Sequence, residues 1–293
     1  MSSVQLLVPC VGNLALLERQ LRSMVAQRDP AWTAVVVAGS ADANGAGPLV
    51  DRLGDDRITH VPWDGSSGIG ATWNRALDLA SATLVALAHD DDELLPGYVG
   101  CVRAAVDAAP RATLIVPRAT SIDREGRPSP GLAERVKDRI APTAQGVTVE
   151  HGQRALVRLM IGQWIVCPTV AYRRDLLGGR RFSTELEQAL DLDLFARLIL
   201  EGAAVASVPD TVYRYRRHAS SQTVRTTTSG RRFREEAEVH HRVAAAASER
   251  GWWAAAAVAK TRPTSRVHEV LVAAEALRQR RRTRAQTLRS EAE

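Results

Sequence analysis

Short runs of apolar residues, most of them β-branched or leucine, recur through the first 120 residues and predict the strands of a sheet. The runs cover residues 4–9, 33–38, 58–61, 83–88 and 113–116. They lack the strict alternation of apolar and polar residues that marks a half-exposed strand, and segments suited to helices separate them. The pattern predicts an α/β fold, with a mostly parallel twisted sheet and helices on both faces.

Helical periodicity between these runs supports the same fold class. Leu14, Leu17 and Leu21 form one apolar stripe, and a second predicted helix covers residues 69–80. Pro96 suits the first turn of a further helix that we expect to run to about Ala109.

The pattern changes after residue 117. Residues 118–150 are rich in proline, glycine and charge, which predicts an irregular surface insertion. Beyond it the sequence predicts a helix at 151–162, a strand at 165–172, a helix at 184–200, two short strands within 205–215 and an alanine-rich helical region after 220.

The charge distribution marks a boundary near residue 220. The 293-residue chain has a net charge of +6, but residues 221–293 contain 15 Lys and Arg against 8 Asp and Glu, whereas residues 1–220 contain 24 against 25. The positive charge therefore belongs to the C-terminal part. We predict a main domain over 1–220 and a basic helical extension over 221–293.

Cysteine usage and hydropathy bear on the compartment. Cys10, Cys101 and Cys167 are scattered in apolar surroundings, which favours buried thiols in a reducing environment. The chain shows no apolar run near the ~20 residues that a membrane span requires, and its first residues lack the pattern of a signal peptide. The expected location is cytoplasmic.

An acidic cluster follows the strand predicted at 83–88. His89 precedes three aspartates and Glu93, and the carboxyl ends of strands are where open α/β sheets bind ligands. One interpretation is a solvated turn in which Asp92 caps the next helix. The other is a site for Mn²⁺ or Mg²⁺, since hard cations require several oxygen ligands.

The order of motifs resembles family 2 glycosyltransferases, which have the A-type nucleotide-sugar fold. The matching residues are Pro9-Cys10-Val11-Gly12-Asn13, Ser23 with Gln27, Gly39-Ser40 with Asp42, Gly68 with Asn74, the aspartates before Pro96, LDLDLFARLILEG from Leu190, and YRYRRHASS from Tyr213. The resemblance covers residues 4–221. It implies a nucleotide-sugar-binding half over 1–117 and an acceptor half over 118–220.

The resemblance also implies roles for residues of the acidic cluster. Asp91 takes the metal-binding position, Asp90 contacts the ribose or the waters of the metal, and Asp92 caps the helix. His218 is either a second metal ligand or a surface residue, and Arg216 is expected to neutralise phosphate. The remaining expected donor contacts are Pro9, Val11, Ala38, Ser40, Asp64, Gly68 and Asn74.

A general base must also take the proton of the acceptor hydroxyl. Asp191 shares a helical stripe with Phe195 and Leu198 that should face the domain, whereas Asp193 aligns with Arg197 as an exposed ion pair. The family position agrees with Asp191, although Leu190 replaces the acid that precedes the base in relatives. A structural cap or a buried acid is the alternative role for Asp191.

Recognition of the donor base departs from the family pattern. Relatives that use uridine or thymidine nucleotides have an acidic pair after the second strand, where this chain has Val37-Ala38. We therefore predict either a donor other than a UDP-sugar or recognition of the base by Asp64, with Trp63 stacking on it. The alternative is that a backbone carbonyl reads the base.

The sequence thus predicts a metal-dependent inverting glycosyltransferase with a nucleotide-sugar donor and an unidentified hydroxyl acceptor, which is a sugar, a glycolipid or a small molecule. The alternatives are a sugar nucleotidyltransferase and a catalytically silent scaffold on the same fold. The extension carries an apolar stripe that includes Val267 and Val270, and arginines follow it. This stripe packs on the domain, forms a homodimer or contacts the inner face of the membrane as a peripheral anchor. Nucleic acid is not expected, because no aromatics interleave with the arginines.

Overall fold

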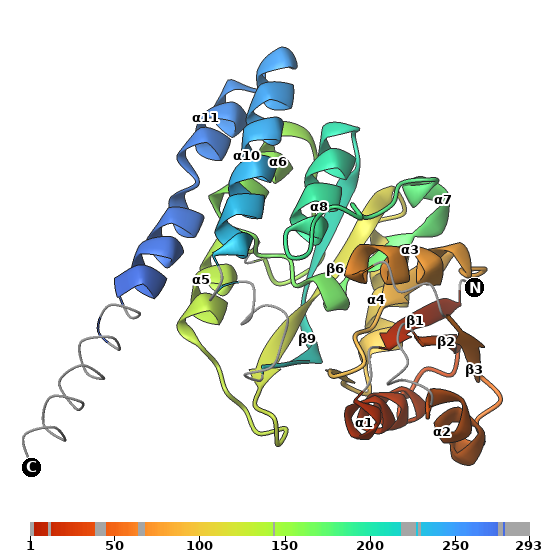
Figure 1. Ribbon diagram of the computed structural model, residues 1–293. Coiled ribbons are helices and arrows are strands. Elements are labelled where there is room, and N and C mark those ends of the chain that lie inside the picture. Colours follow the sequence, from red (N-terminus) through yellow and green to blue (C-terminus); the bar gives the residue numbers. More distant parts are fainter. Residues whose placement is uncertain are drawn as a thin grey trace, which may run out of the picture.

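The computed structural model of the protein describes residues 3–10, 13–38, 45–63, 68–142, 144–217, 227, 230–274 and 278. A twisted sheet runs through the middle of these residues, and helices cover it on both sides (Figure 1). Its strands are β1 (Val4–Cys10), β2 (Trp32–Ala38), β3 (Ile58–Pro62), β4 (Leu84–Leu87), β5 (Glu93–Leu94), β6 (Ala112–Ile122), β7 (Thr148–Glu150), β8 (Ala171–Arg173) and β9 (Ala204–Arg216).

The strand order is β3-β2-β1-β4-β8-β6-β9-β5, with β7 paired to β9. The first four strands are parallel, as are β6 and β9, whereas β8, β5 and β7 pair antiparallel to their neighbours. The predicted fold class, a mostly parallel sheet in an α/β layer, is confirmed. Because β1 and β4 are adjacent and parallel, their carboxyl ends meet at one edge of the sheet, where the acidic cluster lies.

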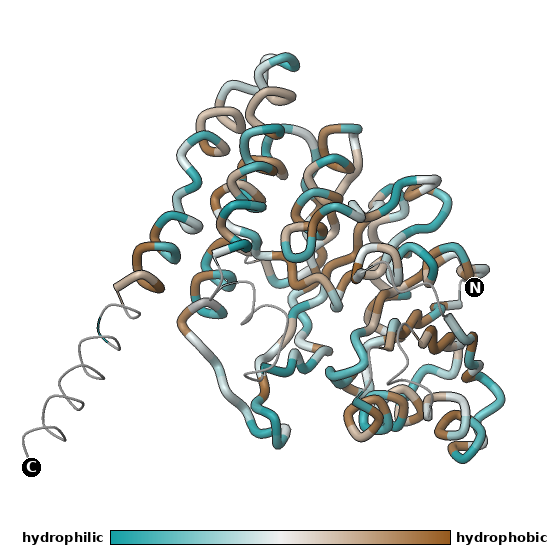
Figure 2. The backbone as a smooth tube through the Cα atoms, viewed as in Figure 1, coloured by the Kyte–Doolittle hydropathy of each residue, from teal (hydrophilic) through white to brown (hydrophobic). Residues whose placement is uncertain are grey.

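The helices divide between the two faces. They are α1 (Leu14–Val25), α2 (Ala46–Leu53), α3 (Ile69–Asp78), α4 (Tyr98–Ala108), α5 (Leu132–Ile140), α6 (Gly152–Ile161), α7 (Arg174–Leu177), α8 (Leu190–Leu200), α10 (Arg231–Glu249) and α11 (Trp253–Thr261). Helices α1, α2 and α4 bury their apolar residues in one core with the sheet, and α3, α6, α8, α10 and α11 build the core on the other face. Figure 2 shows the hydrophobic stretches concentrated in the strands and on the inner sides of the helices.

Several predicted boundaries were wrong, each for a local reason. The stretch 118–150 is not irregular throughout, because β6 continues to Ile122 and α5 and β7 lie within it. The stretch 165–172 was predicted to be a strand, but it contains a 3-10 turn over Cys167–Thr169 and only the start of β8. Its apolar residues suggested a strand because they are buried, although most of them lie in a loop. The helix predicted at 184–200 begins at Leu190.

Strand β9 is continuous where two short strands were predicted. Val116 pairs with Ser207 and Arg118 pairs with Thr211, so residues 208–210 bulge out of the ladder. Pro209 has no N–H to donate, and the bulge removes the need for one. The long β9 therefore reaches the acidic cluster at its far end.

The C-terminal helices are packed on the sheet domain. Helix α10 contacts α8 and α11, and α11 contacts α6 (Figure 1). A further helical stretch covers 263–274. Among the described residues, no helix combines the length and the apolar character that crossing a membrane requires.

Candidate active site

Polar residues on α1 fix one side of the acidic loop that follows β4. The amide of Gln20 donates to the carbonyl of His89 (3.0 Å), the hydroxyl of Ser23 accepts from the N–H of Leu94 (2.9 Å), and the amide of Gln27 donates to the carbonyl of Leu95 (2.9 Å). Gln20 and Ser23 on α1, and Gln27 just beyond its end, thus satisfy backbone groups of a loop about 70 positions later. Ser23 and Gln27, which the sequence matched to a family motif, position this loop.

Arg216 at the end of β9 fixes the other side. Its side chain is fully buried, and its Nε donates to the carbonyl of Asp91 (2.7 Å) while its Nη2 donates to Glu93 (2.5 Å). The Nη1 atom donates to the carbonyls of Asp123 and Arg124, both at 2.9 Å. Four of its five N–H groups are therefore engaged inside the protein. The expected phosphate contact does not fit this geometry; Arg216 organises the loop.

Asp92 does not cap α4, contrary to the prediction. Helix α4 begins at Tyr98, two residues beyond Pro96, and the structure as described shows no side-chain cap at its N-cap residue Gly97. The Asp92 carboxylate is fully buried and accepts hydrogen bonds from the backbone N–H of Arg216 (2.7 Å) and the hydroxyl of Tyr213 (3.1 Å). Two donors of β9 thus hold the Asp92 carboxylate in place.

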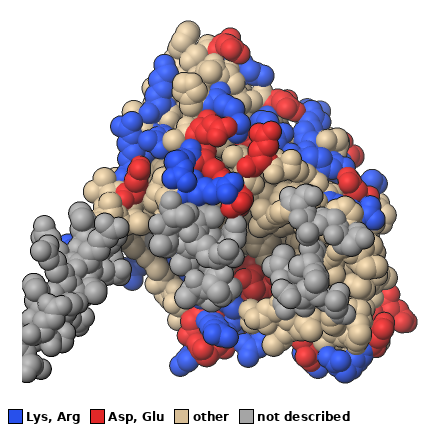
Figure 3. All heavy atoms as spheres, in the orientation of Figure 1, with Lys and Arg blue, Asp and Glu red and all other residues tan. Residues whose placement is uncertain are grey.

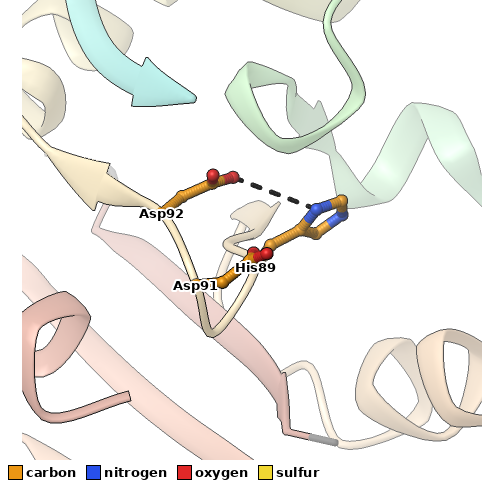
Figure 4. A group of neighbouring side chains, drawn as sticks. All are labelled: His89, Asp91 and Asp92. Atoms are coloured by element: carbon orange, nitrogen blue, oxygen red, sulfur yellow. Dashed lines mark ion pairs between the residues drawn. The ribbon is translucent and has the colours of Figure 1, made fainter. Parts of the chain in front are cut away.

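His89, Asp91 and Asp92 form a group that could hold a divalent cation. One ligand atom from each lies within 4.8 Å of the others, and Nδ1 of His89 is 3.9 Å from Oδ2 of Asp92 (Figure 4). The Nε2 atom of His89 is buried and has no hydrogen-bond partner among the described residues. Two carboxylates and one imidazole are a donor set that fits Mn²⁺.

The protonation of the group follows from burial. Burial, followed by the neighbouring Asp91 carboxylate, raises the pKa of Asp92 well above its ordinary value, although Arg216 and Tyr213 oppose this with hydrogen bonds. Burial lowers the pKa of His89, while Asp91 opposes the change. A neutral imidazole is the form that can bind a metal ion.

Asp90, the expected ribose contact, is buried next to Asp91 in the same loop. Figure 3 shows acidic atoms inside a hollow in the middle of the visible face.

Asp191 lies in the first turn of α8, on a different part of the chain. Its Oδ2 accepts a hydrogen bond from the amide of Gln163 (2.5 Å), and its Oδ1 accepts one from the N–H of Leu192 (2.7 Å). Burial raises the pKa of this half-buried carboxyl, and the Leu192 N–H, the Lys137 ammonium and Gln163 reduce the shift. A carboxyl with a raised pKa that is held by two donors is suited to accept a proton.

Asp193 is paired with Arg197 as predicted (2.8 Å), but it is not exposed. It is 7% exposed, and Arg242 of α10 also donates to it at 2.9 Å. Sequence spacing along α8 identified the first partner. The second partner is 49 residues away, and only the packing of α10 on α8 brings it there.

The loop 163–170 contributes Gln163 to the Asp191 site and carries the buried Cys167. The thiol of Cys167 is buried, which raises its pKa, and the carboxylates of Asp191 and Asp92 both raise it further. On the acidic-loop side, the hydroxyl of Tyr98 donates to the carbonyl of Thr169 (3.0 Å). Trp164 of the same loop is buried in the core.

The structure assigns different positions to the predicted donor contacts. Pro9 and Ala38 are buried near the ends of the parallel strands β1 and β2, at the edge of the sheet where the acidic loop starts. Gly68 precedes α3 with a φ of +91°, a conformation that glycine adopts without strain. Val11, Ser40, Asp64 and His218 lie outside the described residues.

Asn74 makes a structural contact in place of a donor contact. Its side-chain amide donates to the carbonyl of Phe182 and its oxygen accepts from the N–H of Phe182, both at 2.9 Å. Nearby, a Cβ atom on Gly70 would lie 2.2 Å from the carbonyl oxygen of Ser183, so only glycine allows this approach. Helix α3 is thus joined to the segment that leads to Asp191.

Trp63, expected near the base of the donor, makes a cation–π contact with the side chain of Arg75. The guanidinium of Arg75 lies 5.3 Å from the ring centroid. Within the described part of the chain, the buried Nε1 of Trp63 and Nε of Arg75 make no hydrogen bond.

Sequence reasoning missed Gln163, Lys137 and the role of His89. Lys137 stands on α5, in a stretch predicted to be irregular; burial lowers its pKa to about 8, and the Asp191 carboxylate opposes this. Gln163 gave no signal, because a glutamine next to a tryptophan has no distinctive pattern. His89 could have been found, since it belongs to the same run as the aspartates.

Comparison with known proteins identifies a family model and a relative that this chain resembles. The family model described as glycosyl transferase family 2 matches residues 6–168. The uncharacterized protein MT1568 of Mycobacterium tuberculosis is 27% identical over 242 residues, which cover 78% of this chain and 71% of that protein.

Solved structures share the fold. The S. aureus TarS 1–349 structure in complex with UDP-GlcNAc has a TM-score of 0.63 at 19% identity, and the match covers 83% of this chain but 66% of that one. A further structure of S. aureus TarS 1–349 has a TM-score of 0.61 at 17% identity, and the match covers 65% of that chain, just under two thirds. The mannosyltransferase PcManGT from Pyrobaculum calidifontis, in complex with GDP-Man and Mn²⁺, has a TM-score of 0.61 at 18% identity, with 94% of this chain and 87% of that chain covered.

Proposed function

The chain belongs to glycosyl transferase family 2, and we propose that it transfers a sugar from a nucleotide-sugar donor to a hydroxyl group of an acceptor, with inversion at the anomeric carbon and with a divalent cation. The observation that carries the proposal is the presence of two acidic sites, one in the loop after β4 and one in the first turn of α8. One has the composition of a metal site, and the other is a single carboxylate with a raised pKa.

Asp91, with His89 and Asp92, would hold Mn²⁺ or Mg²⁺, which supplies the positive charge that a departing nucleoside diphosphate needs. The protein's own contribution is a rigid loop. Arg216 and α1 hold the backbone of residues 89–95 from two sides, so the carboxylates keep their positions when the diphosphate leaves.

Asp191 would act as the general base. Its carboxylate takes the proton of the acceptor hydroxyl as the hydroxyl oxygen bonds to the anomeric carbon. Gln163 and the N–H of Leu192 keep the carboxylate in one orientation, and each oxygen retains a lone pair for the incoming proton. Lys137 favours the charged form that is required before the reaction.

Recognition of the donor base is part of the proposal. Val37 and Ala38, the last two residues of β2, occupy the position of the acidic pair, and both are buried. We propose that the donor is either not a UDP-sugar or has its base bound by Asp64. TarS is in complex with UDP-GlcNAc and PcManGT with GDP-Man, so both nucleotide classes belong in the test.

The C-terminal helical stretch 263–274 carries an exposed apolar surface. Val267, Val270 and Leu271 are more than half exposed, and Figure 2 shows a hydrophobic segment at this end of the described chain. We propose that this surface contacts anionic membrane, where arginines would add about 1 kcal/mol each, with a homodimer as the alternative. Flotation is compared between vesicles that contain phosphatidylserine and vesicles that lack it. Membrane contact predicts flotation with the former only, and a homodimer predicts flotation with neither.

The function is tested by release of nucleoside diphosphate. Wild type is incubated with UDP-, dTDP-, GDP- and ADP-sugars in the presence of Mn²⁺, with water as the acceptor, and the same panel is repeated with EDTA. Release from at least one donor that EDTA abolishes supports the proposal. Absence of release, together with absence of Mn²⁺-dependent nucleotide binding, rejects it.

A further inference from the structure

The N-terminus of α8 is held by a residue from the C-terminal extension. One oxygen of Glu235, in α10, accepts hydrogen bonds from the N–H groups of Gln188 (2.7 Å) and Ala189 (3.1 Å), and both its oxygens lie within 3.2 Å of the N–H of Glu187. Helix α8 begins at Leu190 and receives no cap from the side chain of its own N-cap residue, Ala189. The carboxylate of Glu235 instead binds the N–H of this N-cap residue and of the two residues before it, so α10 fixes the chain where it enters α8.

Further contacts fix Glu235 in turn. Arg231, one turn earlier in α10, donates to Glu235 at 2.8 Å and pairs with Glu187 at 2.7 Å. Glu235 is 7% exposed; burial alone would raise its pKa, but the Gln188 N–H, Arg231 and the Ala189 and Glu187 N–H groups bring it below the ordinary value. The group is therefore ionised at neutral pH, and its charge faces the positive end of the α8 dipole.

The contact between Glu235 and residues 187–189 matters because Asp191 lies only two residues after Ala189. The carboxylate of Asp191 must reach Gln163 on one side and the substrate on the other. A shift of about 1 Å at a catalytic group can lower a rate about a hundredfold. In the same helix pair, Arg242 of α10 binds Asp193 of α8, so the two helices are joined at a second point.

We propose that Glu235 is a positioning residue for Asp191, which makes α10 part of the catalytic apparatus although it lies beyond residues 6–168 that the family model matches. The proposal rests on the function proposed above, since it takes Asp191 as the base.

The test compares two neighbouring glutamates. Glu236 is buried to the same degree, 8% exposed, but it binds Arg232 and Ser265 within the extension. Glu236→Ala is therefore the matched control for Glu235→Ala, and Glu235→Gln, which keeps an acceptor oxygen without the charge, is the conservative variant. Amide hydrogen exchange of residues 187–189 and Mn²⁺-dependent hydrolysis of the donor that wild type accepts are measured for all three.

We expect Glu235→Ala to speed exchange of these amides by about tenfold or more and to lower kcat by about tenfold to a hundredfold with donor KM unchanged. Glu235→Gln should recover part of both, and Glu236→Ala should change neither, even with a similar loss in Tm. Retained amide protection in Glu235→Ala, or a kcat equal to that of Glu236→Ala, overturns the inference. A wild type that hydrolyses no donor and shows no Mn²⁺-dependent nucleotide binding rejects the proposed function instead, while the exchange measurement still decides whether Glu235 fixes the entry to α8.

Discussion

Asp91 and Asp191 are held by different parts of the chain. The loop that carries Asp91 is fixed by α1 on one side and by β9 on the other, and the loop and α1 fall within the residues matched to the family. Asp191 lies in the first turn of α8, outside that match, and Glu235 of α10 holds the residues that lead into this helix. The comparison indicates that each acid depends on a partner distant in the sequence, because Arg216 of β9 and Glu235 of α10 both lie outside residues 6–168.

The largest expected effect is on the donor side. Asp91→Ala should abolish Mn²⁺-dependent nucleotide binding, because the cation loses the carboxylate expected to bridge it to the diphosphate. In wild type, nucleotide at 100 times its Kd should add about 2.7 kcal/mol to the free energy of unfolding, and this gain should disappear in the variant. Thermal shift with UDP and GDP, with and without Mn²⁺, measures it.

Asp107→Ala is the matched control, since Asp107 is exposed on α4, away from the loop. It should keep the full Mn²⁺-dependent shift. If Asp91→Ala keeps that shift as well, the donor side does not use Asp91 as its metal ligand.

Arg216 tests whether the rigidity of the loop matters. Arg216→Met leaves Glu93 without its buried partner and three carbonyls without a donor, so unfolding free energy should fall by about 3 kcal/mol. Arg217→Met, an exposed neighbour, should stay within about 0.5 kcal/mol of wild type. Urea denaturation of both variants measures the difference; equal stabilities would mean that Arg216 does not organise the loop.

On the acceptor side, Asp191→Asn should bind donor as wild type does and lose turnover about a hundredfold, which corresponds to about 2.7 kcal/mol in the activation free energy. Steady-state hydrolysis gives kcat, and calorimetry gives the Kd of the donor. A loss in Kd with kcat intact would assign Asp191 to donor binding.

The same variant should be more stable than wild type at alkaline pH. Burial raises the folded-state pKa of Asp191 above the unfolded value, so ionising this carboxyl costs stability as the pH rises through the folded pKa. Asparagine removes that cost, and the advantage should vanish at a pH below the unfolded pKa. Tm measured from pH 3 to pH 8 gives the trend; a constant difference would contradict the assigned shift.

The smallest expected effect concerns the second join between α8 and α10. Asp193→Asn should lower unfolding free energy by about 1 kcal/mol, because the buried carboxylate binds Arg197 and Arg242. A double-mutant cycle with Arg242→Met should show coupling between the two residues. Additive effects would mean that the contact adds no stability.

The sequence was sufficient for the fold class, and it was insufficient for the contacts that hold the candidate acids. Apolar runs located the first four parallel strands, and helical spacing placed Asp191 with Phe195 on the stripe of α8, where Phe195 packs in the core. Proline and charge hid α5, and with it Lys137. Asp92 was assigned to a helix cap because Pro96 suggested an earlier helix start, whereas its partners Arg216 and Tyr213 are more than 120 residues away. Partners of this kind are fixed by tertiary packing, which local pattern does not encode.

The most direct test of the central claim is diphosphate release by wild type and by Asp191→Asn, measured side by side with Mn²⁺ and with EDTA. Two separately held acidic sites that act on one donor predict release by wild type, its loss with EDTA, and a loss of about a hundredfold in Asp191→Asn without loss of donor binding. Release that is insensitive to both EDTA and the substitution would contradict the account.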